Sequence, residues 1–223
     1  MLPLTFAPDR QPLLVPSHRA IKAGHPMRKI SDVLLAAGAA AFLFALPAWA
    51  AAEPGQLVQS VTARVIDIVK TKSGAPREAA FRDVLRNDFD LPYIGRLALG
   101  THWKEASEQQ RARFLAALET AEVRAYSERL GMLAGFTLTI DKVVSQPNSV
   151  WIVDSLLSQA SRQPIKLEWE VRDNGQGPRI ADIKIAGVSM FATRRSEFNA
   201  FIHNTGGTVE PLVKELEVRA ARQ

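Results

Sequence analysis

The side chains that most often carry out catalysis are few in this 223-residue sequence, and they match none of the common catalytic motifs. Beyond the first 50 residues there are two histidines, His102 and His203, which lie 101 positions apart. No H-E-x-x-H pair for zinc and no G-x-S-x-G turn for a nucleophilic serine is present. The absence of cysteine excludes disulfides, thiolate metal sites and thiol nucleophiles. We therefore expect no metal site.

Two nearby carboxylates, Asp88 and Asp90, have the residue type that acid–base catalysis needs. An Asp followed within two residues by proline, as Asp90 is by Pro92, is more typical of a helix cap. The Gly175-Gln176-Gly177 stretch predicts a hairpin turn, because no helix with phosphate-binding residues follows it. We expect no catalytic residue and no cofactor. The alternative is an enzyme that uses Asp88, Asp90 or His102.

Near the N-terminus a basic pair, an apolar run and a small-residue segment follow one another. They are Arg28-Lys29, Val33 to Leu46, and Pro47-Ala48-Trp49-Ala50. The apolar run has 14 residues, fewer than the roughly 20 that a membrane-spanning helix needs. No cysteine follows, which excludes a lipoprotein anchor. The pattern predicts a signal peptide at residues 27–50, cleaved near Ala50, and a periplasmic protein.

Residues 1–26 match no part of a signal peptide, and we interpret them as an extension from a start codon placed too early. Residues 51–223 then form a single domain of ordinary size. Removing residues 1–50 takes away five basic and two acidic residues, so the net charge falls from +5 to +2. The remaining charges are mixed without a basic run, which argues against nucleic-acid binding and favours a monomer.

The spacing of apolar residues is helical before residue 135, alternates until about residue 187, and is helical again afterwards. Helices are expected at 54–70, 77–86 and 91–99, from Ser107 to near Gly131, and as a final pair separated by Gly206-Gly207. Strands are expected at 136–141, 150–157, 165–172 and 180–186. The sequence predicts an α+β fold, a curved antiparallel four-stranded sheet covered by helices. This pattern does not directly distinguish a solid core from a cavity.

Five short motifs occur in a fixed order. They are Asp90-Leu91 with Ile94; Leu99-Gly100 with Trp103; Ser107 with Gln110 and Phe114; Asp182-Ile183 leading to Gly187-Val188-Ser189-Met190; and Arg195 with Phe198. Through them the chain, from about Phe81 to its C-terminus, resembles the MlaC family of periplasmic phospholipid-binding proteins, historically called the toluene-tolerance family. It departs at Pro178-Arg179-Ile180, where many members have Trp, and at Arg194, where they have Tyr.

The resemblance implies that the fold encloses an apolar lipid cavity and that the protein is a carrier without catalytic groups. It also implies a phospholipid ligand, an inner-membrane ABC transporter complex and an outer-membrane lipoprotein as partners. Some family members are associated with hopanoid synthesis genes, so a polycyclic hopanoid is the alternative cargo. A non-lipid-binding adaptor between membrane complexes is the alternative of another class.

The candidate lipid-binding residues are apolar side chains that the periodicity places toward the interior. Only the resemblance indicates that they line a cavity and do not simply fill an ordinary core. They are Ile94, Leu97, Phe114, Leu118, Phe136, Leu138, Ile152, Leu167, Trp169, Ile183, Val188, Met190, Phe191 and Phe198. Arg194 and Arg195 form an adjacent basic pair that is expected to contact a lipid head group or a partner. A solvated helix face is the alternative for this pair.

Overall fold

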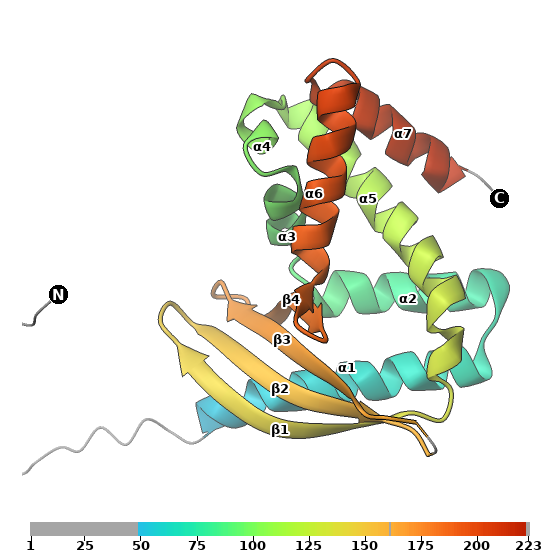
Figure 1. The fold of residues 1–223 in the computed structure, drawn as a ribbon, viewed down its shortest axis with the longest axis vertical. Helices are drawn as coiled ribbons and strands as arrows, with labels where there is room; N and C mark the ends of the chain where they lie inside the picture. The colour runs from blue at the N-terminus through green and yellow to red at the C-terminus, as the bar shows by residue number, and fades with distance from the viewer. Residues whose placement is uncertain (1–48, 161, 222–223) are drawn as a thin grey trace, which may run out of the picture. The chain divides into compact units, whose positions relative to one another are not determined.

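The computed structural model describes residues 49–160 and 162–221, so the expected signal peptide and N-terminal extension lie almost entirely outside the described residues. Helices precede and follow a single sheet (Figure 1). The helices are α1 (Trp49–Thr71), α2 (Gly74–Asp88), α3 (Leu91–Leu99), α4 (His102–Glu105), α5 (Glu108–Arg129), the 3-10 helix η1 (Leu130–Leu133), α6 (Met190–Asn204) and α7 (Val209–Ala221). The strands are β1 (Thr137–Gln146), β2 (Val150–Ser158), β3 (Ile165–Asp173), β4 (Pro178–Ile185) and β5 (Val188–Ser189).

The sheet is an antiparallel meander in the order β1-β2-β3-β4-β5. The α+β class and the curved antiparallel sheet agree with the sequence, but the expected number of four strands is wrong. The fifth strand is a two-residue hairpin partner of β4, formed because Ala186 and Gly187 adopt left-handed φ values of 50° and 84°. A strand of two residues is too short to show any alternation, so the sequence pattern does not predict it.

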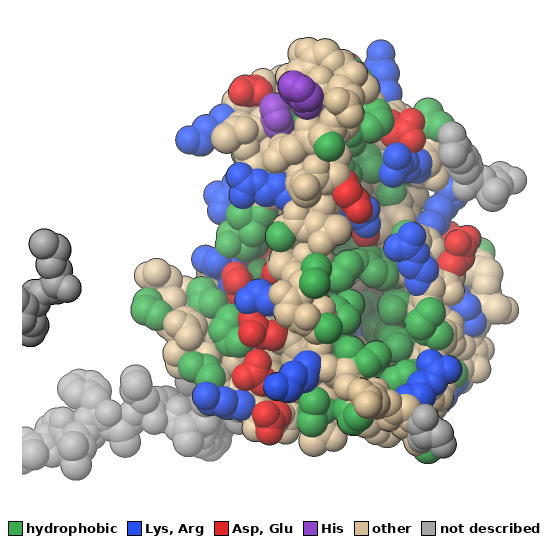
Figure 2. Space-filling view, in the orientation of Figure 1, with side chains coloured by type: hydrophobic (Ala, Val, Ile, Leu, Met, Phe, Trp, Pro, Cys, Tyr) green, Lys and Arg blue, Asp and Glu red, His purple; other side chains and the backbone are tan. Residues whose placement is uncertain are grey.

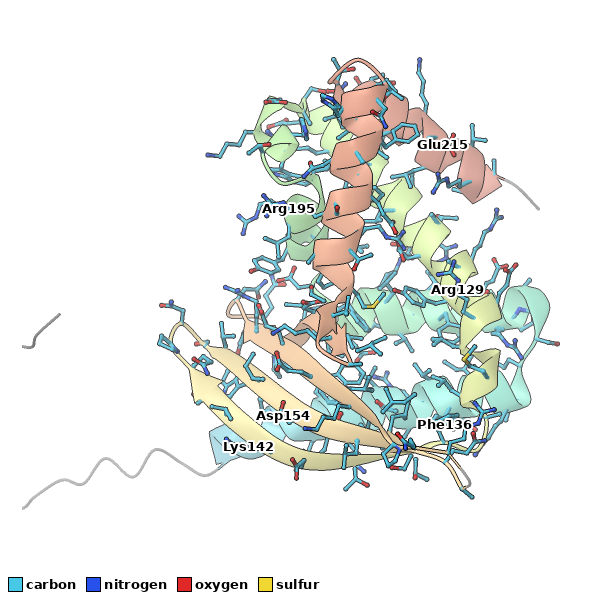
Figure 3. The ribbon with its side chains drawn as sticks, in the orientation of Figure 1. Arg129, Phe136, Lys142, Asp154, Arg195 and Glu215 are labelled. Atoms are coloured by element: carbon cyan, nitrogen blue, oxygen red, sulfur yellow. The ribbon has the colours of Figure 1, made fainter. Side chains whose placement is uncertain are left out.

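One face of the sheet packs against α1 and α2 and forms a first hydrophobic core. Across the strands Val143, Val153, Trp169 and Ile183 lie in register on this face. Trp169 is buried, and its indole N–H donates to Ser155 Oγ at 2.9 Å, so the polar edge of the ring is satisfied inside the core. The opposite face is polar, with Lys142, Asp154, Glu168 and Lys184 in register, and Figure 3 labels Lys142 and Asp154.

A second hydrophobic core lies among the helices α3, α5, α6 and α7, above the sheet in Figure 1. At its centre the rings of Phe114 and Phe198 meet edge to face, with centroids 5.7 Å apart. Arg113 on α5 holds α7 by ion pairs to Glu210 at 2.9 Å and to Glu217 at 2.8 Å. The two cores meet where Asp90 N donates to Ile180 O at 2.9 Å, which ties the start of α3 to β4.

Several element boundaries differ from the sequence-based expectation. The helix expected at 77–86 begins at Gly74, because Pro76 lies in its first turn, where a missing N–H costs nothing. The strand expected to end at 141 continues to Gln146, because a bulge between Ile140 and Lys142 shifts the alternation. The expected helix at 54–70 begins at Trp49. Neither α4 nor η1 was expected, since four residues are too few to show a period.

None of the helices within the described ranges combines the length and apolarity needed to cross a membrane.

Candidate functional site

A hollow lined by hydrophobic side chains opens between α5 and α6, above the sheet and in front of α2 (Figure 2). We call it the α5–α6 hollow. It exists because α6 packs chiefly against α3 and α5 packs against α7 and α2, so the two helices diverge toward the sheet. Apolar concavity of this kind is the usual form of a site for an apolar ligand.

An ion pair joins the two helices that flank the hollow. Arg194 Nη2 on α6 donates to Glu122 Oε2 on α5 at 2.9 Å and lies 2.8 Å from Oε1. Arg194 Nη1 donates to Glu197 Oε2 at 2.7 Å, and the guanidinium lies 5.9 Å from the ring centroid of Phe198. This α5–α6 ion pair and the Phe114–Phe198 contact fix the spacing of the helices.

The ion pair is partly buried, with 26% of the Arg194 side chain and 15% of the Glu122 side chain exposed. Burial raises the pKa of the Glu122 carboxyl, and the charge of Arg194 offsets only part of the rise. Burial likewise raises the pKa of Tyr126, one turn further along α5. Glu122 and Tyr126 are therefore partly shielded from water on this side of α5.

The expected lipid-binding residues divide between the two cores. Those in the first core are Phe136, Leu138, Leu167, Trp169 and Ile183. Those in the second core are Phe114, Leu118 and Phe198, and Ile94 is buried on α3. Met190 and Phe191 are partly buried in the first turn of α6.

Two of these candidates do not lie on the inward side that the sequence indicated. Val188 is 59% exposed, because it belongs to the short hairpin strand β5. Ile152 pairs with Glu170 on the polar face of the sheet, opposite to Val153, because both phases of β2 are apolar and the sequence does not reveal which one faces α1.

A second, mixed-polarity cleft of about 410 Å³ lies on the other side of α6, toward α3. We call it the α3–α6 cleft. It separates the two expected basic residues, because neighbours on a helix point about 100° apart. Arg194 takes part in the ion pair with α5, whereas Arg195 lines the α3–α6 cleft (Figure 3). Leu97 and Phe191, expected in a lipid cavity, line this cleft.

A third concavity, of about 550 Å³, lies between α1 and the edge strand β1. Its apolar part comes from Ala63, Ile140 and Val143. Gly55 lets the helix approach the strand closely, since a Cβ there would lie 3.3 Å from Val143 Cγ2.

Comparison with known proteins identifies the family of this chain. The sequence model of the MlaC protein family matches residues 59–218. The chain belongs to the MlaC family. A solved structure from Ralstonia solanacearum, described as a phospholipid-binding protein in complex with a phospholipid, is similar in fold, with a TM-score of 0.64 and 20% sequence identity. The match covers 77% of this chain and 97% of that one.

The MlaC motif residues mainly fix helix ends and one turn. Asp90 caps α3 by accepting from Tyr93 N at 3.1 Å, and Ser107 forms a capping box with Gln110 at the start of α5. Asp182 accepts from Ser189 Oγ at 2.6 Å and so ties β4 to the start of α6. In this chain, the motif residues thus have structural roles at helix ends and at one turn. They carry no direct information on which apolar side chains line a cavity.

The three residues that an enzyme was expected to use, Asp88, Asp90 and His102, each have a structural partner in this MlaC chain. Asp88 accepts from Arg64 Nη2 at 2.6 Å, Asp90 is a cap, and His102 Nδ1 lies 3.0 Å from Glu105 Oε2. Within residues 49–160 and 162–221, no group of three or more His, Cys, Asp or Glu side chains could hold a metal ion.

Proposed function

We propose that this chain is a periplasmic carrier that binds the apolar part of a phospholipid and moves it between the outer and inner membranes. The observation that carries the proposal is the α5–α6 hollow, lined by hydrophobic side chains on a fold that belongs to the MlaC family. The phospholipid complex of the similar Ralstonia solanacearum structure supports the same ligand class.

The physical need for such a carrier follows from the cost of exposing acyl chains to water. Each buried methylene contributes about 0.8 kcal/mol, so a two-chain lipid leaves a bilayer too rarely to cross an aqueous compartment unaided. A protein that replaces the bilayer with a dry surface removes this barrier. That task needs no catalytic group, so we propose that the protein is not an enzyme.

The proposed partners are an inner-membrane ABC transporter complex, which the carrier serves as a soluble component, and an outer-membrane lipoprotein. Export rests on the basic, apolar and small segments between Arg28 and Ala50. Edman sequencing of the protein from the periplasmic fraction, after expression of the full chain, tests the export step. We expect the mature chain to begin at Ala51. A chain that retains residues 27–50 and stays with the membrane would contradict it.

Lipid transfer between vesicles tests the carrier function itself. Protein purified without detergent is mixed with donor vesicles of deuterated phosphatidylethanolamine and phosphatidylglycerol and with unlabelled acceptor vesicles. We expect deuterated lipid in the acceptors at a rate proportional to protein concentration. Transfer of hopanoid but not of either phospholipid would redirect the cargo. The absence of any transfer would leave an adaptor as the remaining function.

A further inference from the structure

The α3–α6 cleft has one wall that suits an anion. Arg195 lies against the C-terminal end of α3, where a Cβ on Gly100 would be 2.9 Å from Arg195 Nε. Among the residues that the structure describes, Arg195 has no hydrogen bond or ion pair, unlike Arg194 beside it. Its planar fork of donors is therefore free to bind an oxyanion.

One turn further along α6, Asn199 lines the same cleft. Its Oδ1 atom is buried and has no hydrogen-bond partner. Leaving a buried amide oxygen unpaired costs free energy of about 1–3 kcal/mol. An anionic ligand, whose oxygens only accept, would remove this cost by accepting from the amide N–H of Asn199 in its flipped orientation. Ser196 lines the same cleft.

The facing wall is acidic. Glu170 on β3 and Asp182 on β4 are cross-strand partners on the polar face of the sheet, and both line the cleft. Asp182 is held by Ser189 Oγ at 2.6 Å, and Glu170 accepts from Arg172 Nη1 at 3.2 Å. The Arg172 guanidinium offsets part of the Glu170 charge. The remaining negative charge of this wall repels a simple anion and attracts an ammonium group.

We propose that the α3–α6 cleft binds a zwitterionic amine phosphodiester of the phosphoethanolamine class. The phosphate lies against Arg195, Ser196 and Asn199, and the ammonium lies against Glu170 and Asp182. The volume of about 410 Å³ is within the range of small-molecule sites. Leu97 and Phe191 offer apolar contact to the glycerol end.

This chemistry has two sources, the head group of a membrane lipid and a soluble glycerophosphodiester. The lipid source rests on the proposed carrier function and requires one lipid to reach from this cleft around α6 to the α5–α6 hollow. The soluble source requires neither. Isothermal titration with glycerophosphoethanolamine, glycerophosphoglycerol and inorganic phosphate tests the cleft directly. We expect glycerophosphoethanolamine to bind at least tenfold more tightly than either anion.

Three substitutions test what each wall of the cleft contributes to binding. Arg195→Gln should weaken glycerophosphoethanolamine at least tenfold, and Arg195→Lys, which keeps the charge without the fork, should weaken it less. Glu170→Gln should abolish the preference for the amine. Arg219→Gln is the matched control, because the Arg219 guanidinium pairs with Glu215 on α7, away from the cleft. It should change neither the affinity for glycerophosphoethanolamine nor the preference for the amine. Equal binding of all three probes, or unchanged binding in the folded Arg195→Gln and Glu170→Gln variants, would overturn the proposal.

Loading from vesicles of equal phosphatidylethanolamine and phosphatidylglycerol then identifies the source. If the lipid is the source, the wild-type protein is enriched in phosphatidylethanolamine, and Glu170→Gln carries the same total lipid without enrichment. Binding of glycerophosphoethanolamine without lipid enrichment supports the cleft with a soluble ligand. Loss of all lipid from the wild-type protein contradicts the carrier function and leaves the titration as the test of the cleft.

Discussion

Glu119 and Glu122 lie less than one turn apart on α5, yet their surroundings change their pKa values in opposite directions. Burial favours the neutral form of Glu119, but hydrogen bonds from Arg86 and Arg82 at 3.0 and 2.7 Å outweigh it and lower its pKa. At Glu122 burial outweighs Arg194, and the pKa is raised. Glu119 therefore stabilises the fold as a carboxylate, whereas Glu122 is a carboxylate held at a cost.

Glu119→Gln should lower the free energy of unfolding at pH 7 by about 1–2 kcal/mol, because it leaves two arginines without their carboxylate. The value is modest because both arginines are partly exposed. A lowered folded-state pKa gives stability that is present above the unfolded-state pKa and is lost as the pH falls through the folded-state pKa. Urea unfolding should therefore show the difference from wild type shrinking as the pH falls below 4.5, the unperturbed value.

Glu122→Gln should behave in the opposite way. A raised folded-state pKa means that the wild type is most stable where Glu122 is protonated and loses that stability as the pH rises through the folded-state value. The glutamine variant does not titrate, so its stability relative to wild type should increase as the pH rises from the unperturbed 4.5 toward neutrality. A variant whose stability relative to wild type falls as the pH rises over this range would contradict the raised pKa.

At the scale of elements, α3 shows how two glycines on one helix differ. Gly100 ends α3 with φ 57° and ψ −126°, a conformation that side chains with a Cβ strongly disfavour. Gly95 lies inside the helix, where a Cβ would meet Leu115 Cδ2, the far end of a flexible side chain, at 2.3 Å.

Gly100→Ala should therefore cost about 1–3 kcal/mol of unfolding free energy, as a strained backbone does. Gly95→Ala should cost less, because Leu115 can turn away and alanine favours the helix by about 1 kcal/mol. Chemical denaturation of both variants measures this. If the cost at Gly100 came from the nearby Arg195 side chain instead, adding Arg195→Ala would restore stability, and we expect that it does not.

The spacing of α5 and α6 is the element-level feature on which lipid exchange should depend. The sequence has no cysteine, so the variant with Glu122→Cys and Arg194→Cys can be cross-linked with a short bismaleimide at those two sites alone. We expect the linked protein to exchange lipid with vesicles far more slowly than the same variant without linker. Either single variant treated with the reagent is the control. Equal exchange rates would exclude the α5–α6 hollow as the entrance.

At the scale of the whole molecule, the sequence predicted the class of fold and the chain order of its long elements. Periods of 3.6 and 2 are visible over ten residues, so α5 and β3 were placed to within a residue or two. The bulge after Ile140 and the two-residue β5 were hidden, since each breaks or falls short of a period.

The site was harder to predict than the fold. Alternation identifies a dry face, but it does not tell whether that face is filled by neighbours or left open. Ile152 and Val188 show this, because one lies on the polar face and the other is exposed. The different roles of Arg194 and Arg195 depend on which helix lies on each side of α6, which is a property of the tertiary structure.

The central claim is that the protein holds a phospholipid. Native mass spectrometry of the protein purified from periplasm without detergent, followed by solvent extraction, tests it most directly. We expect a mass excess equal to one diacyl phospholipid and recovery of that lipid in the extract. A protein that remains empty, even after incubation with vesicles of phosphatidylethanolamine and phosphatidylglycerol, would contradict the carrier function.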